Sequence, residues 1–132
     1  MTSSLFSAAA AASLVLVALY DPAVAAANDY RFEPINAVVR NGDGATLSVR
    51  LLHVPTGKPV AGAIVFRTRI DMSPDGMPTM TAKYEPLPET EPGIYRFKAN
   101  LTMAGGWALK LMAKVQGEAE TVTATVVFTA KD

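Results

Sequence analysis

The stretch Trp107-Ala-Leu-Lys-Leu-Met-Ala-Lys-Val115 predicts a β-strand with one buried face. Its apolar residues recur at every second position, which is the period at which side chains of a strand point to the same face of a sheet. Lys110 and Lys114 occupy the alternate positions and would face solvent. Gly105-Gly106 directly before the stretch is a turn signal that separates it from the preceding run. The chain therefore contains at least one half-buried strand of the kind found in a packed sheet.

The same alternation recurs along the chain, in runs that Gly- and Pro-containing segments separate. No run after Asn28 shows the apolar period of a helix. Two packed antiparallel sheets are the simplest way to bury strands that are each apolar on one face. We therefore expect an all-β fold, an immunoglobulin-like antiparallel β-sandwich of about seven strands, in one domain over residues 26–132. The expected strands span residues 30–40, 46–54, 63–72, 80–87, 94–101, 107–115 and 120–129.

The first 25 residues have the layout of a secretory signal peptide. Residues 5–20 form an alanine-rich apolar run that is short for a membrane span, and Ala23-Val24-Ala25 supplies a small-x-small cleavage site. No Lys or Arg precedes the apolar run, so retention of residues 1–25 as an N-terminal anchor is the alternative to cleavage. An exported chain without cysteine fits a bacterial periplasm. Membrane contact is expected only through this segment, if it is not cleaved.

Composition argues against several functional classes. The chain has 12 basic and 12 acidic residues and no basic run, so a nucleic-acid partner is not expected. The absence of cysteine removes disulfides, zinc fingers and thiolate chemistry. His53 is the only histidine, and no nucleophile motif accompanies it. Carboxylate pairs such as Glu89 and Glu91 lie in turn-like segments where solvated charge is the ordinary explanation. We therefore expect no enzyme.

Methionines gather in residues 71–80, where Met72, Met77 and Met80 fall within nine positions. The intervening Pro and Gly residues break any regular element that could bury all three. Met72 and Met103 continue the apolar parity of their strands, so both also fit simple core packing. A thioether is a soft ligand that selects ions of the Cu(I) type. The cluster is thus either an irregular loop at the rim of the sandwich or part of a soft-metal site.

Two further residues have both a structural and a functional interpretation. Trp107 starts an inward-facing series and fits the core, but it lies four residues from Met103 and could shield a bound ion. His53 ends a predicted strand and fits a half-buried imidazole, but it could also supply a nitrogen ligand. Met112 lies on the polar parity between two lysines and is excluded from the candidate site.

Four segments together resemble the FixH/YtkA-like family of small exported or membrane-tethered β-sandwich domains. They are residues 56–63, 71–77, 92–97 and 101–109, which read TGKPVAGA, DMSPDGM, PGIYRF and LTMAGGWAL. The resemblance implies copper handling, near heavy-metal efflux systems of the resistance-nodulation-division type or in cytochrome oxidase assembly. It implies Met72, Met77 and Met103 as ligands, with Trp107 as their neighbour. The chain departs from tethered FixH in having only a signal-like segment, and it lacks the His-rich loop of some relatives.

Two hypotheses follow. In the first, the chain is a periplasmic, non-enzymatic domain that binds Cu(I) or Ag(I) and assists heavy-metal efflux or copper delivery. Met72, Met77 and Met103 would supply thioethers, Met80 or His53 a further ligand, and Trp107 would cover the ion. In the second, the same end of the sandwich docks on a protein of an efflux or oxidase-assembly complex with no metal bound. Convergence of the sulfur atoms would favour the first hypothesis, and an outward spread of the sulfurs the second.

Overall fold

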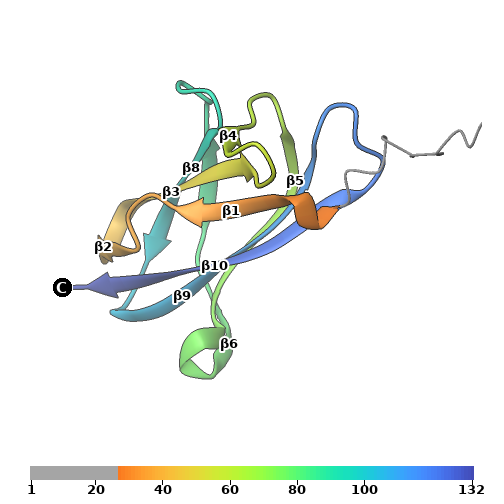
Figure 1. The fold of residues 1–132 in the computed structure, drawn as a ribbon. Helices are drawn as coiled ribbons and strands as arrows, with labels where there is room; N and C mark the ends of the chain where they lie inside the picture. The colour runs from red at the N-terminus through yellow and green to blue at the C-terminus, as the bar shows by residue number, and fades with distance from the viewer. Residues whose placement is uncertain (1–26) are drawn as a thin grey trace, which may run out of the picture.

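The computed structural model describes residues 27–132 and shows two β-sheets packed face to face (Figure 1). The ordered elements, in chain order, are η1 Ala27–Asp29, β1 Tyr30–Pro34, β2 Val38–Arg40, β3 Gly42–His53, β4 Lys58–Pro59, β5 Ile64–Met72, η2 Ser73–Asp75, β6 Met77–Thr81, β7 Tyr84–Leu87, β8 Ile94–Leu101, β9 Gly105–Lys114 and β10 Thr121–Lys131. The predicted signal peptide lies outside the described residues. No helix within residues 27–132 is long and apolar enough to cross a membrane.

Sheet A has the strand order β1-β3-β8-β7, with the two-residue strand β4 also paired to β3. Sheet B has the order β2-β10-β9-β5-β6. Every strand pair is antiparallel except β2 and β10, which run parallel. The predicted all-β, immunoglobulin-like sandwich is confirmed, although the sheets contain ten strands within residues 27–132 where about seven were expected.

The core lies between the sheets and consists of the residues whose alternation predicted the fold. Trp107 of β9 is fully buried and lies directly opposite Phe128 of β10 in the strand register. Leu47, Val49 and Leu51 of β3 meet them from sheet A. Burial of such side chains contributes about 1.5–3 kcal/mol each and is the main force that holds the two sheets together.

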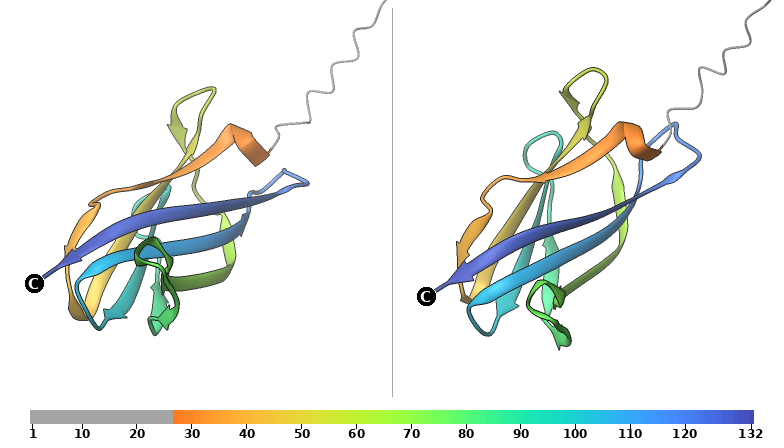
Figure 2. Two further views of the ribbon diagram at one scale, coloured as in Figure 1. Left: turned by 90° about the horizontal axis from the view of Figure 1, so that it is seen from below. Right: turned by 60° about the horizontal axis from the view of Figure 1, so that its bottom comes forward.

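Two predicted strands are in fact pairs of strands that belong to different sheets. Residues 30–40 divide into β1 in sheet A and β2 in sheet B, and Figure 2 shows the chain crossing between the sheets there. The segment around Asn36 makes the crossing, with the Ile35 amide still bonded to sheet A and the Ala37 carbonyl already bonded to Thr129 of sheet B. Residues 80–87 divide in the same way into the end of β6 and β7. Apolar alternation continues across a sheet switch, so it does not reveal the break.

The start of β3 and a bulge in β5 differ from what the sequence predicts. The sequence Asn-Gly-Asp-Gly at residues 41–44 predicts a turn, but Gly42 already begins β3, and a register shift follows between Gly42 and Ala45. In β5 the register shifts between Val65 and Arg67, so residues before the shift face differently from the expected pattern. Alternation in phase with Ile70 predicts that Ile64 and Phe66 face inward, but both are exposed. One extra residue reverses the facing of everything on one side of it.

Candidate functional site

The methionine-rich segment folds into a tight turn at one end of the sandwich, where η2 leads into β6, the edge strand of sheet B (Figure 1). Pro74 occupies the start of the 3-10 helix η2, where a missing amide hydrogen costs nothing. Gly76 ends η2 with a φ of 75°, in the left-handed region that glycine adopts without a steric penalty. Its amide donates a hydrogen bond to the Ser73 carbonyl. The turn brings Met77 back beside Met72, and the two are register partners across β5 and β6.

The turn between β8 and β9 lies against this segment, although thirty residues separate them in sequence. The Gly106 amide donates a hydrogen bond of 3.0 Å to the Asp75 carboxylate. A Cβ placed on Gly105 would meet the Asp75 carboxylate and would lie 2.8 Å from the terminal methyl of Met72. The backbone therefore approaches so closely that neither glycine could carry a side chain without a shift of its neighbours. These contacts place the Met103 turn beside Met72.

Trp107 fixes the turn that carries Met103. Its indole is fully buried, and its Nε1–H donates a hydrogen bond of 3.0 Å to the Met103 carbonyl oxygen. The ring thus fills the core and closes the turn at once. The structure places Trp107 next to Met103 through this backbone contact, as the short sequence spacing predicted.

The four candidate thioethers differ in exposure. Met72 is fully buried in the core cluster, and Met77 is half-buried against it. Met80 and Met103 are 36% and 39% exposed. The fold therefore brings Met72 and Met77 together and sets the Met103 turn beside them, while Met80 lies three residues further along β6. Of these four residues, Met77, Met80 and Met103 reach solvent, whereas Met72 does not.

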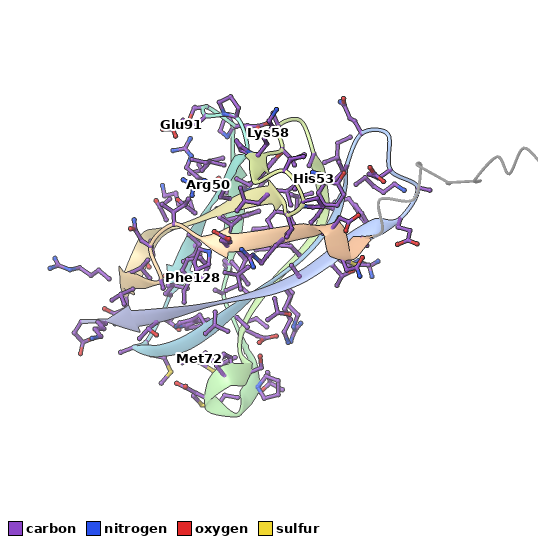
Figure 3. The ribbon with its side chains drawn as sticks, in the orientation of Figure 1. Arg50, His53, Lys58, Met72, Glu91 and Phe128 are labelled. Atoms are coloured by element: carbon purple, nitrogen blue, oxygen red, sulfur yellow. The ribbon has the colours of Figure 1, made fainter. Side chains whose placement is uncertain are left out.

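His53 lies away from the methionines, near the opposite end of the sandwich from Met72 (Figure 3). Its Nδ1 is 2.8 Å from the Thr56 hydroxyl oxygen, and its ring centroid is 5.2 Å from that of Tyr30. Tyr30 and Lys58 are its register partners on the two neighbouring strands. The structure thus places His53 beside the β3–β4 turn. It does not bring His53 to the methionine end, which is the end of the sandwich that carries Met72, Met77, Met80 and Met103.

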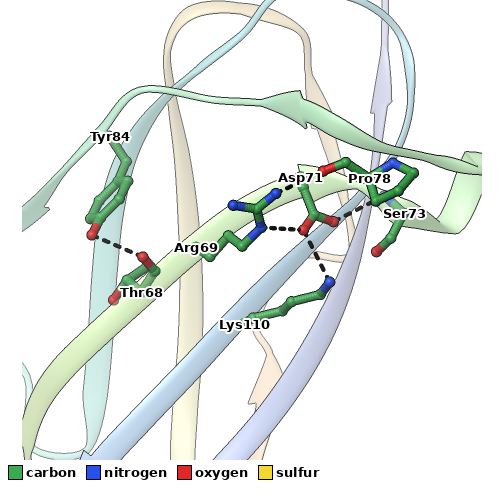
Figure 4. A network of polar contacts seen from close by, with 7 residues as sticks. All are labelled: Thr68, Arg69, Asp71, Ser73, Pro78, Tyr84 and Lys110. Atoms are coloured by element: carbon green, nitrogen blue, oxygen red, sulfur yellow. Dashed lines mark hydrogen bonds and ion pairs between the residues drawn. The ribbon is translucent and has the colours of Figure 1, made fainter.

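Asp71 is a buried charged residue, although its alternation with Ile70 and Met72 in the sequence predicts a place on the solvent face of its strand. Its side chain is fully buried, and its Oδ2 lies 2.8 Å from Arg69 Nε and 3.0 Å from Lys110 Nζ (Figure 4). The Ser73 amide donates to Oδ1 at 3.0 Å, and Arg69 also donates to the Pro78 carbonyl. Burial acts to raise the pKa of Asp71, but these hydrogen bonds outweigh it and hold the pKa well below its ordinary value.

This network ties the methionine turn to sheet B, since it joins β5, β9, the start of η2 and β6. Arg69 and Asp71 share a strand face at a spacing of two, which was visible in the sequence. Lys110 comes from β9, and only the β5–β9 register brings it beside Arg69. Within residues 27–132 there is no group of three or more His, Cys, Asp or Glu side chains that could hold a metal ion.

Comparisons with known proteins give a family and two distant structural likenesses. The Lin-41 filamin domain is 15% identical over 80% of this chain and 95% of its own, with a TM-score of 0.46. The ZirS C-terminal domain is 10% identical over 100% of this chain and 87% of its own, with a TM-score of 0.45. None of the curated proteins matches the chain. The YtkA-like family model matches residues 24–112, which include the Met72–Met77 turn and the turn that carries Met103. The chain therefore belongs to the YtkA-like family.

Proposed function

We propose that the methionine end binds a soft monovalent ion, Cu(I) or Ag(I), and that the domain is a periplasmic, non-enzymatic carrier in heavy-metal efflux or copper delivery. The observation that supports this proposal most is the meeting of two thioether-bearing turns. The hydrogen bond from Gly106 to Asp75 joins the two turns, and the hydrogen bond from Trp107 to Met103 closes the second turn, before any ion arrives. A site whose supports are already in place needs less ordering when the ion binds.

The exposure of the methionines assigns them different roles. Met77 and Met103 supply the ligands that an incoming ion meets first, since Met77 is half-buried against the core and Met103 is exposed on the neighbouring turn. Met72 is buried beneath them, so its sulfur becomes a ligand only if the ion binds closer to the core. Met80 is the outer ligand on β6, and the buried Trp107 ring is the wall of the site. His53 has no role in this arrangement because it lies at the other end.

The charge around the site suits transfer rather than storage. Thioethers are neutral, so they leave the charge of a bound ion uncompensated. The Asp75 carboxylate contacts Gly105 and lies close to the Met72 methyl, so it supplies a negative charge beside the site. A hard carboxylate is a poor ligand for a soft ion and acts here through its field. Modest affinity and ready release to a periplasmic partner protein follow.

The test is a Cu(I) titration of the purified protein in competition with a Cu(I) chelator. Met77→Leu/Met103→Leu removes two thioethers at nearly constant volume, and we expect it to bind Cu(I) at least tenfold more weakly than the wild type. Met112→Leu is the matched control, because Met112 lies outside this end on β9. Equal Cu(I) retention by the wild type and the double variant would end the proposal.

Docking without metal is the second candidate, and the exposure of Met80 and Met103 favours it. Exposed methionines adapt to varied partner surfaces. On this hypothesis the β6 segment and the Met103 turn contact a protein of an efflux or oxidase-assembly complex. The titration separates the two hypotheses, because docking predicts no Cu(I) retention by the wild type.

A further inference from the structure

The outer face of sheet B has an unusual charge distribution. Register places six cations on it, because each is paired with another outward-facing residue of a neighbouring strand. They are Arg40, Arg67, Arg69, Lys110, Lys114 and Lys131. The chain has 12 Lys and Arg residues in all, so half of them share this one face. The acid on these outward positions is Asp71, which is buried and already paired with two of the cations.

The outer face of sheet A is built differently. Glu33 lies directly opposite Arg50 across β1 and β3, and Glu85 lies opposite Lys98 across β7 and β8. The outward positions of sheet A also include Arg31 and Arg96, so four cations there accompany two acids. Opposite charges at facing positions stabilise a sheet. Since the whole chain has as many acids as bases, the excess on sheet B leaves the rest of the molecule acidic. The outward strand positions of both sheets therefore carry a net positive charge, which is larger on sheet B, and the remaining acids lie outside these positions.

The cations are spread over a broad surface and have apolar neighbours. They come from β2, β10, β9 and β5, which lie side by side in sheet B, and Figure 2 shows β9 and β10 crossing the front of the molecule. Val38, Ile64 and Val127 occupy outward positions on the same face and are exposed. A shallow hollow of about 260 Å³ lies among Arg67, Arg69 and Lys110, with Met112 and Ala124 at its floor. Threonines of β10 fill the remaining outward positions.

We propose that this outer face of sheet B docks on an anionic phospholipid bilayer. Dispersed cations match the uniform negative charge of such a surface, and each contributes about 1 kcal/mol near it. The exposed aliphatic side chains reach the boundary of the acyl chains, as in other interfacial surfaces. A narrow acidic peptide would meet only part of the four-strand face. The outer face of sheet B has the larger excess of positive charge, which favours its orientation toward the lipid.

Arg67 and Lys131 are the cations best suited to a test, because neither takes part in an ion pair within residues 27–132. Arg50 and Lys98 of sheet A are matched controls that also lack such pairs. Arg67→Gln/Lys131→Gln and Arg50→Gln/Lys98→Gln have the same net charge. Equal melting temperatures of the two variants would show that both are folded. Any contribution of the N-terminal segment is common to both.

The experiment is co-sedimentation of the full chain with phosphatidylcholine vesicles, with or without an equal part of phosphatidylglycerol. At low salt we expect phosphatidylglycerol to increase binding of the wild type. Arg67→Gln/Lys131→Gln should reduce that increment about thirtyfold, from two cations at about 1 kcal/mol each. The sheet A variant should keep it. The proposal is overturned by equal losses in both variants, by a wild type indifferent to phosphatidylglycerol, or by binding to polyglutamate in place of the vesicles, which would indicate an acidic protein partner.

Discussion

Asp71 and Met72 are consecutive residues of β5, both fully buried, on opposite faces of one strand. Asp71 is held on the outer side by Arg69, Lys110 and Ser73. Met72 is held on the inner side by the hydrophobic core, with its methyl against Gly105. One position depends on charge and hydrogen bonds, and the other depends on packing.

The difference shows how the methionine turn is fixed from two sides by unrelated forces. Asp71 binds the first residue of η2 and, through Arg69, the β6 backbone. Met72 anchors the same strand end in the core. The Asp71 hydrogen bonds and the packing of Met72 together hold the strand end, while Met77 and Met103 lie near solvent. A preorganised ligand site requires such support. The two contributions should respond differently to substitution and to pH.

The largest effect is expected from the packed side. Met72→Ala should lower the free energy of unfolding by about 3 kcal/mol, because it leaves a cavity in a close-packed core. Denaturant unfolding measures the change. Met72→Leu conserves volume and should cost less than about 1.5 kcal/mol. Equal losses for the two variants would show that the sulfur itself, and not packing, stabilises this position.

A smaller effect is expected from the charged side. Asp71→Asn should lower the free energy of unfolding by about 2 kcal/mol through loss of charge-assisted hydrogen bonds. The loss is limited because Arg69 and Lys110 are both more than a third exposed and can regain water. Asp43→Asn, at an exposed position of β3, is the matched control and should change stability little. A neutral Asp71→Asn would contradict the role assigned to the network.

Acid should weaken the charged side alone. The folded state lowers the pKa of Asp71, so its stabilisation is complete above the ordinary aspartate pKa of about 4 and is lost as the pH falls below that value. Thermal unfolding across this range should show a steeper loss for the wild type than for Asp71→Asn. Met72→Ala should keep the wild-type pH dependence. Parallel acid profiles for the wild type and Asp71→Asn would contradict the assigned pKa shift.

Apolar alternation was enough to predict the class of fold and most of the core. It worked for Trp107 and the residues in phase with it because these strands are uninterrupted. It was wrong for Ile64 and Phe66, since a bulge in β5 reverses the pattern and leaves no local sign of itself. It also missed the sheet switches near Asn36 and Ala82, where a strand of one sheet follows almost directly on a strand of the other.

The candidate site could be predicted only in part. The turn residues around Met72 and the Gly105-Gly106 pair predicted two irregular segments, and the structure shows that they meet. The remote position of His53 and the Lys110 contact of Asp71 depend on strand order and register, which no local pattern encodes. Sequence spacing identifies residues that can be neighbours along a strand, but not across a sheet.

The most direct test of the soft-metal proposal is methionine-methyl NMR of the protein labelled with ¹³C at the methionine methyl groups, during titration with Ag(I). Ag(I) is a soft ion that prefers thioethers and does not change oxidation state during the titration. The account predicts saturable shifts of the Met77 and Met103 methyl signals, a smaller shift of Met72, and no shift of Met112. Unchanged Met77 and Met103 signals, or equal shifts of every methionine including Met112, would contradict it.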